Sequence, residues 1–177
     1  MKQLITTRLR LVPLRVDHAG AMFSLLSDPR IYEFIQDEPP ASLESLQERY
    51  HRHETRHSPD GTEQWLNWII QPLESDACMG FIQATIYTSA TADFAFVLGP
   101  SYWGRGLALE AASSALHTLF TDYAIISMFA MADERNVRST SLLTRLGFQR
   151  VECVNHPHRA VLPSDHLFLL NRRLNTP

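Results

Sequence analysis

The sequence predicts one α+β domain with a mixed, mostly antiparallel sheet. Its 177 residues are enough for one ordinary domain with a hydrophobic core, so residues 1–177 are expected to form a single unit. Apolar residues make up 45% of the chain and charged residues 20%, a balance typical of globular proteins. The predicted elements follow the order β-α-α-β-β-β-α-β-α-β-β, which lacks the regular strand–helix alternation of a doubly wound fold.

Hydrophobic periodicity and turn residues place the elements of the first half. Leucines alternate with arginines over residues 8–14, which predicts a strand. Asp17 is expected to cap a helix that stops near Pro29, and Ser42 is expected to cap a second helix that stops near residues 58–61. Three strands are then expected at residues 65–71, 78–87 and 93–98.

The second half alternates strands with two helices. Residues 107–123 are expected to form a helix and residues 125–132 a buried strand. Asn136 is expected to cap a helix that ends at Gly147. One face of the first of these helices carries the small side chains of Ala108, Ala111, Ala112 and Ala115. Two closing strands are expected at residues 148–154 and 166–174.

Charge, cysteine content and apolar runs narrow the class of protein. The net charge of −3 argues against direct nucleic-acid binding, which usually needs a basic face. No apolar run approaches the length of a membrane span, and the N-terminus shows no apolar signal region. Cys78 and Cys153 are expected to be reduced and not bridged, so a cytoplasmic protein is expected.

The stretch SYWGRGLALEA, residues 101–111, joins a predicted strand to a predicted helix through Gly104 and Gly106. Glycines let backbone N–H groups approach a ligand, and the first N–H groups of a helix attract anions. This turn therefore predicts a phosphate or pyrophosphate site, although an isolated GxG also forms simple turns. A Walker A loop is excluded because no lysine follows the glycines, and the dinucleotide fingerprint fails at Leu109.

The same stretch resembles motif A of the GNAT acetyltransferases, in the PxYWGxGxAxEA form of their RimJ/RimL-like branch. Three further segments agree in the right order, so the resemblance covers nearly the whole chain. These segments are TTRLRLVPL at residues 6–14, NVRS at 136–139 with the LGF turn at 146–148, and SDH at 164–166.

The resemblance implies a GNAT fold, with a sheet of about seven strands, splayed central strands and about four flanking helices. It implies acetyl-CoA as co-substrate without a metal, the pantetheine arm lying between the splayed strands. Asn136 is expected to face the cofactor, although a plain role as helix cap would suffice alone. The other cofactor-binding residues implied are Phe96, Val97, Leu98, Trp103, Gly104, Arg105, Gly106, Leu107 and Ala108.

Acetyl transfer to an amine needs a neutral nucleophile and a proton for the departing thiolate. An α-amine titrates near pH ~7.7–8.0 and a lysine near ~10.4, so an α-amine needs less help. Asp93, at the start of the strand entering the cleft, is the candidate base, against a plain role as an exposed aspartate. Ser139 is the candidate acid, against a plain role in a first helical turn. Leu143 stands where many members carry a tyrosine, and Ser101 where motif A has Gln or Arg.

The acceptor that the resemblance implies is a primary amine, above all the N-terminal α-amine of a protein or peptide. A small-molecule amine, and a GNAT-fold protein that binds acyl-CoA without turnover, are the alternatives. The acceptor groove is expected between the first two helices, the loop at residues 155–165 and the strand beside it. A homodimer is left open.

Residues 53–57 read HETRH, a literal HExxH, so a zinc hydrolase is the rival from another reaction class. On a helix, His53 and His57 would share one face, with Glu54 as general base. The polar flanks and the turn residues at 58–61 argue against such a site. A solvated helix end without a metal is therefore expected.

Overall fold

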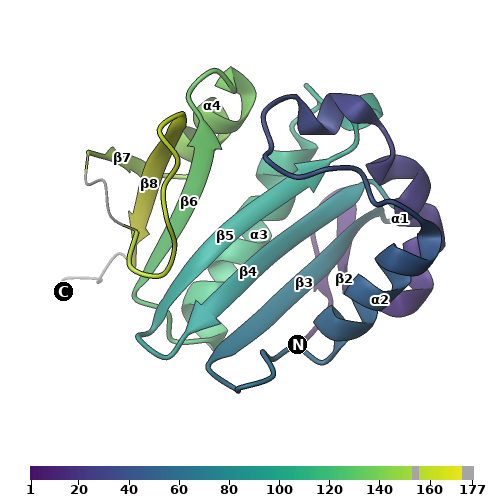
Figure 1. Cartoon of the computed structure of the whole chain (residues 1–177), viewed down its shortest axis with the longest axis horizontal. Helices are drawn as coiled ribbons and strands as arrows, with labels where there is room; N and C mark the ends of the chain where they lie inside the picture. Colours follow the sequence, from purple (N-terminus) through teal and green to yellow (C-terminus); the bar gives the residue numbers. More distant parts are fainter. Residues whose placement is uncertain (153–155, 173–177) are drawn as a thin grey trace.

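The computed structural model describes residues 1–152 and 156–172, which form one eight-stranded sheet with helices on both faces (Figure 1). The strand order is β1-β2-β3-β4-β5-β6-β8-β7. Every neighbouring pair is antiparallel except β5 and β6, which run parallel. The predicted α+β class with a mixed, mostly antiparallel sheet is therefore confirmed.

Residues 1–102, all of them described, contain the first five strands and two helices. Their bounds are β1 Leu4–Ile5, β2 Leu9–Pro13, α1 Ala19–Leu26, α2 Leu43–Glu54, β3 Glu63–Pro72, β4 Gly80–Tyr87 and β5 Thr91–Leu98. Three short 3₁₀ segments are η1 Val16–His18, η2 Pro29–Glu33 and η3 Pro100–Tyr102. The two-residue β1 was not predicted, because so short a strand has no detectable period, and it brings the sheet to eight strands.

The remaining elements complete the sheet around the glycine turn. They are α3 Leu107–Asp122, β6 Ser127–Asp133, α4 Val137–Arg145, β7 Gln149–Val151 and β8 Asp165–Asn171. The strands expected at residues 148–154 and 166–174 run into residues 153–155 and 173–177, which lie outside the described residues, as does Cys153. Within the described part of the chain, no helix is long and apolar enough to cross a membrane.

Local capping signals predict two helix starts correctly and fail at a third. Ser42 and Asn136 cap α2 and α4, each by accepting a backbone N–H from the third residue of its helix. The prediction that Asp17 caps α1 was wrong. Asp17 lies inside η1, a turn in which the N–H of Arg15 donates to Nδ1 of His18 (3.0 Å). This turn precedes α1 and takes the place of an aspartate cap.

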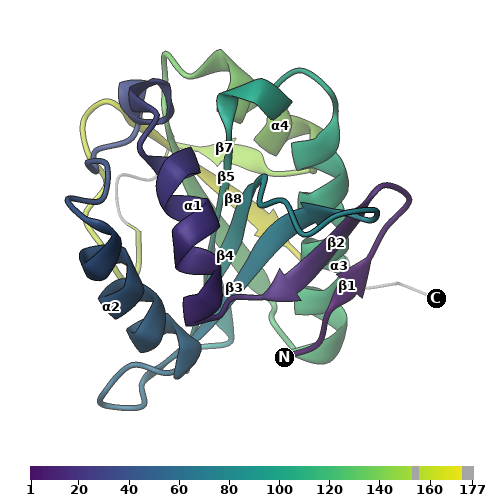
Figure 2. The ribbon, with the colours of Figure 1, turned by 90° about the vertical axis from the view of Figure 1, so that its right-hand side faces the viewer.

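The helices cover opposite faces of the sheet (Figure 2). α1 and α2 lie on one face and α3 on the other. Ala111, Ala112 and Ala115 of α3 are fully buried, which confirms the small face and lets the helix approach the sheet closely. A smaller core around Met22 and Leu46 lies beneath α1 and α2. The sheet is therefore packed on both sides.

Candidate active site

The central parallel strands, β5 and β6, separate along their length. Residues 91–93 pair with residues 127–129, and beyond them the strands diverge towards α4 (Figure 1). The edge of β5 at residues 94–98 therefore faces a cleft. Two cavities of 430 and 340 Å³ occupy this region, and both have Phe96, Asn136 and Ser139 in their walls. The splay that the resemblance implies is present.

The 340 Å³ cavity, called the donor cavity below, reaches the N-terminus of α3. Gly104 (φ 72°) and Gly106 (φ 73°) adopt the left-handed conformation that favours glycine. Gly106 is the N-cap of α3 and provides no side-chain cap, so the first helical N–H groups are left for a ligand or water. All the predicted cofactor-binding residues except Arg105 line this cavity.

Arg105 supports the turn instead of lining the donor cavity. Its side chain is exposed, and its backbone carbonyl accepts a hydrogen bond from Nη1 of Arg8 (3.1 Å). Nε of Arg8 in turn donates to Oε2 of Glu110 in α3 (2.6 Å). These contacts tie the turn between β1 and β2 to the start of α3, and so hold the glycine turn in place.

Three arginines that were not predicted at the site also line the donor cavity: Arg30, Arg138 and Arg145. The guanidinium carbon of Arg138 lies 4.7 Å from the centre of the Trp103 ring. Arg30 is held by Asp28. Arg138 and Arg145 are seven residues apart in one helix and share a face, a sequence signal that pairs them without locating the cavity they border. Their positive charge suits phosphate groups.

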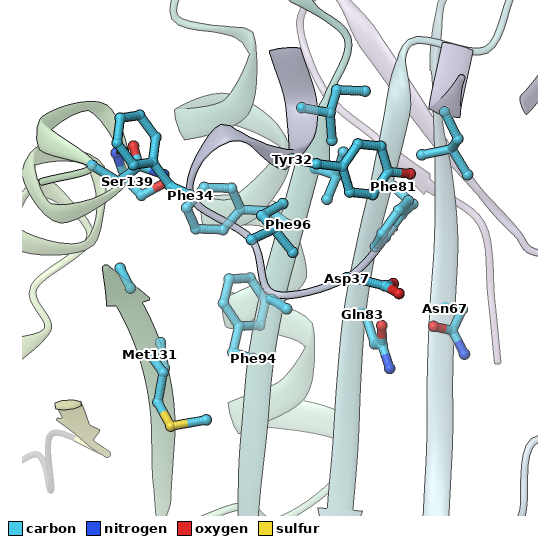
Figure 3. A pocket seen from close by; sticks show the side chains of 18 of the residues that line it. Tyr32, Phe34, Asp37, Asn67, Phe81, Gln83, Phe94, Phe96, Met131 and Ser139 are labelled. Carbon is cyan, nitrogen blue, oxygen red and sulfur yellow. Dashed lines mark hydrogen bonds between the residues drawn. The ribbon is translucent and has the colours of Figure 1, made fainter. Parts of the chain in front are cut away.

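Asn136 caps α4 and also faces the cleft, so its two proposed roles are compatible. Its Oδ1 accepts the N–H of Ser139 (3.1 Å), and both residues line the two cavities. Figure 3 shows Ser139 beside Phe34. Leu143, one turn further along α4, is buried in the wall of the 430 Å³ cavity and carries no hydroxyl. Ser139 therefore supplies a hydroxyl where the two cavities meet.

Asp93 lies at the closed end of the cleft, where β5 and β6 still pair, in the wall of a third cavity of 140 Å³. Its carboxylate binds Tyr87 Oη (2.9 Å), Arg159 Nη2 (2.6 Å) and His156 Nε2 (2.6 Å). Burial raises the pKa of Tyr87 to about 12, so the phenol stays protonated and donates. Asp93 and Ser139 lie in the walls of different cavities among these three. The Asp93 carboxylate thus holds three neighbouring side chains.

His156 was not singled out from the sequence, and its hydrogen bonds fix the imidazole in one tautomer. Its Nδ1 accepts the backbone N–H groups of His158 and Arg159 (3.1 Å each), so Nδ1 carries no proton. Nε2 therefore carries the ring proton and donates to Asp93. Burial lowers the pKa of His156, although the Asp93 charge acts in the opposite direction. The neutral imidazole thus fastens residues 156–159 over the closed end of the cleft.

The 430 Å³ cavity, called the acceptor cavity below, has residues of η2, α1 and α2 in its wall. Figure 3 shows side chains that line it. The predicted helices and loop contribute Leu26, Tyr50 and Arg159 to its wall. The wall also contains Ile31 and Tyr32 of η2, which was not predicted, and Phe34 and Ile35 directly after it. The sheet adds Asn67, Phe81, Gln83 and Phe94. Sequence periodicity misses these residues because their convergence depends on how distant segments pack.

The HExxH segment does not form one helical face. His53 belongs to α2 and packs edge-on against Trp65, with ring centres 5.7 Å apart. His57 lies beyond the end of α2, where it pairs with Gln64 in an isolated bridge. Glu54 accepts a backbone N–H from η1. The zinc site needed both histidines on successive turns of one helix, and that arrangement is absent from these described residues.

Comparison with known proteins agrees with this geometry. The family described as acetyltransferase (GNAT) domain matches residues 8–149. The N-acetyltransferase p20 of Bacillus licheniformis, itself uncharacterised, is 24% identical over 152 residues, which are 85% of this chain and 84% of p20.

Solved structures share the fold at lower identity. An acetyltransferase (GNAT family) from Bacillus anthracis has a TM-score of 0.76 at 16% identity, over 96% of this chain and 98% of that chain. RimL, described as a ribosomal L7/L12 alpha-N-protein acetyltransferase in complex with coenzyme A, has a TM-score of 0.80 at 14% identity, again over 96% and 98%.

The sheet splits between β5 and β6, with the glycine turn and the N-terminus of α3 beside the split, in a chain that the acetyltransferase (GNAT) domain family matches over residues 8–149. The chain belongs to the GNAT acetyltransferase family, and it is an acetyltransferase.

Proposed function

We propose that this enzyme moves the acetyl group of acetyl-CoA to a primary amine, and that the amine is the N-terminal α-amine of a protein or peptide. The observation that carries the proposal is the junction of the two cavities at Phe96, Asn136 and Ser139. A donor in one cavity and an acceptor in the other meet there. RimL, which shares the fold, is described as an alpha-N-protein acetyltransferase, and this supports the choice of an α-amine.

The donor cavity fits the parts of acetyl-CoA. The glycine turn and the uncapped start of α3 suit the pyrophosphate, with Arg138 and Arg145 nearby for further negative charge. The edge of β5 at residues 94–98 has no strand partner on its β6 side among the described residues, so its backbone groups suit the amides of the pantetheine arm. Acetyl-CoA supplies the activated thioester when it is bound.

The chain's own side chains then handle protons. An α-amine titrates near pH ~7.7–8.0 and so needs little help to become neutral. Ser139 is assigned as the donor of the proton that the departing thiolate needs, because it lines both cavities while Leu143 offers no hydroxyl. Asp93 is assigned as base through a water. Its bonds to three donors favour a second role, in which it positions Arg159 in the acceptor wall.

Each alternative has an observation in its favour. A small-molecule amine fits a 430 Å³ cavity, which is within the ~300–1,000 Å³ of small-ligand sites. Binding of acyl-CoA without turnover would fit the missing α4 tyrosine at Leu143. Ser101, the other departure from motif A, is exposed in η3 and does not line the donor cavity. The serine at position 101 is therefore weak evidence against turnover.

The test is CoA release by purified protein against N-terminal peptides, polyamines and aminoglycosides, with calorimetric binding of acetyl-CoA measured in parallel. We expect binding, and the highest kcat/KM with a peptide. The matched control is the same peptide with its N-terminus already acetylated, which should give only background release. A preference for polyamines or aminoglycosides supports a small-molecule acceptor, and binding without release across the panel supports a non-catalytic protein. Absence of acetyl-CoA binding would contradict the proposal.

A further inference from the structure

Two residues in the wall of the acceptor cavity each carry a buried polar group that has no hydrogen-bond partner among the described residues. These groups are the hydroxyl of Tyr50 in α2 and the side-chain nitrogen of Asn67 in β3. Both residues are 4% exposed. Burial raises the pKa of Tyr50, so its hydroxyl keeps its proton and remains a donor. Buried polar groups are almost always paired, so two orphans in the wall of one cavity point to a ligand that pairs them.

Asn67 begins a row of side chains that crosses the sheet towards the cleft. The strand register places Asn67 beside Gln83 of β4, and Gln83 beside Ala95 of β5. Neighbouring strands are about 4.8 Å apart, so the row spans about 10 Å. Figure 3 shows Asn67 and Gln83 next to each other, with Asp37 on the same side of the cavity. Ala95, being small, leaves room between these amides and the cleft.

The row of Asn67, Gln83 and Ala95 is called the amide row below. Aromatic rings occupy the space between the amide row and Ser139. Figure 3 shows Phe94 and Phe96 between Ser139 on one side and Gln83 on the other. Further rings come from Tyr32, Phe34 and Phe81. Such a wall suits an apolar or aromatic group of the ligand.

Charges near the amide row occur in opposite pairs. Asp37 and Arg49 are 3.7 Å apart, and Arg159 binds Asp93 at 2.6 Å. Burial lowers the pKa of His53, so its imidazole is neutral at pH 7. A neutral ligand group therefore suits this end of the cavity better than a charged one.

We propose that the acceptor is a primary amine joined through an apolar, aromatic-sized body to a neutral carbonyl group, whose oxygen accepts hydrogen bonds from Tyr50 and Asn67. The inference rests on the proposed acetyl transfer. It places the amine near Ser139 and the carbonyl at the amide row, with the aromatic rings of Phe94 and Phe96 between them. A free small molecule and the first residue of a peptide can both supply this chemistry, so the experiment includes both.

Three matched amines test the carbonyl. 4-(2-Aminoethyl)benzamide, phenethylamine and 4-(2-aminoethyl)benzoic acid share the amine and the ring and differ in the group at the far end. We measure kcat/KM by CoA release, and the Kd of each amine by calorimetry with and without CoA. The benzamide is expected to exceed phenethylamine by about tenfold or more, since phenethylamine leaves both buried donors unpaired. The benzoate is expected to be weaker than the benzamide.

A peptide arm separates the two sources of this chemistry. One pentapeptide is made with either 4-carbamoylphenylalanine or phenylalanine as its first residue. If the pentapeptide with 4-carbamoylphenylalanine is preferred over the one with phenylalanine, the carbonyl belongs to the side chain of a peptide's first residue. A preference confined to the free amines assigns a small-molecule acceptor.

Variants connect the preference to the two donors. Tyr50→Phe and Asn67→Leu should abolish the benzamide preference while Tm stays equal or rises, because each removes an unpaired buried group. The matched control is Gln71→Leu, also buried and on β3. The Gln71 amide is already paired with Nε of Arg10 and the carbonyl of Asp76 (3.0 Å each), so this variant should lose Tm and keep the preference.

The outcomes separate this inference from the proposed function. Equal Kd values for benzamide and phenethylamine, or no binding of either, overturn the inference. If CoA release with other amines persists, acetyl transfer still stands. A preference that survives in both Tyr50→Phe and Asn67→Leu also overturns it. Calorimetry measures the Kd of each amine whether or not turnover occurs. It therefore tests the inference even for a protein that releases no CoA.

Discussion

The Asp93 carboxylate accepts a hydrogen bond from the His156 imidazole at 2.6 Å, across 63 positions of sequence. The contact joins the paired end of β5 and β6 to residues 156–159. The same carboxylate holds Arg159, which lines the acceptor cavity. One strand residue thereby anchors the loop that borders the acceptor site.

Replacing Asp93 by asparagine keeps the size of the side chain and removes its charge. We expect kcat to fall by about 10²–10⁴-fold if Asp93 is the base. The Kd of acetyl-CoA should be nearly unchanged, because Asp93 does not line the donor cavity. A base role lowers kcat, whereas a positioning role raises the acceptor KM. Asp122→Asn, at the exposed end of α3, is the control, and full activity of Asp93→Asn would remove both roles.

Ser139→Ala tests the proton donor. The variant should lower kcat and leave acetyl-CoA affinity nearly unchanged. Asn136 accepts the backbone N–H of Ser139 and not its hydroxyl. The cap of α4 therefore survives, and Tm should not move. Ser113→Ala on the exposed side of α3 is the control. Steady-state kinetics with calorimetry decide the matter, and an unchanged kcat argues against the role.

His156 should make folding stability depend on pH. Its pKa is lowered in the folded protein, whereas the unfolded chain titrates near ~6.5, so the unfolded chain binds the proton more readily. The stability it contributes is present above pH ~6.5 and is lost as the pH falls below that value. Urea unfolding should show a smaller decline from pH 7 to pH 5 in His156→Gln than in the wild type. Exposed His117→Gln should keep the wild-type decline, and identical slopes in all three proteins contradict the assignment.

Gly106→Ala tests the backbone of the glycine turn. A Cβ there would lie 3.6 Å from Nη2 of Arg8, an ordinary contact, so the penalty comes from φ of 73° and should be about 1–2 kcal/mol. Binding of acetyl-CoA should weaken because the turn shifts. Gly20→Ala in α1 meets open space and should gain about 0.5–1 kcal/mol without affecting binding. Equal urea midpoints for the two variants would refute the backbone argument.

Much of the fold could be predicted because its signals are local. The alanine face of α3, the caps at Ser42 and Asn136, and the glycines at the start of α3 depend on helical period, hydrogen bonds to near neighbours and backbone conformation. The same logic failed at Asp17, where Arg15 and His18 form a competing local turn. It also missed the two residues of β1.

Most of the lining of the proposed donor cavity could be located from the sequence because it is one continuous segment. Phe96, Val97 and Leu98 lead into the turn, and the turn leads into α3, so one motif locates them together. Arg138 and Arg145 come from α4, whose position beside that segment depends on how the sheet splits. Spacing along one helix gave no sign of which cavity they would border.

By itself, the sequence determined the class of fold and located the segment proposed to bind the donor, since short-range periods and backbone preferences encode both. Only the tertiary structure decided the wall of the 430 Å³ cavity, the proposed acceptor half. The register of β3, β4 and β5 brings Asn67, Gln83 and Ala95 into one row, and the packing of α2 adds Tyr50 to the wall of the same cavity. Asp93 meets His156 only after the chain has folded back. Such neighbours are set by long-range pairing and packing, which no local pattern specifies.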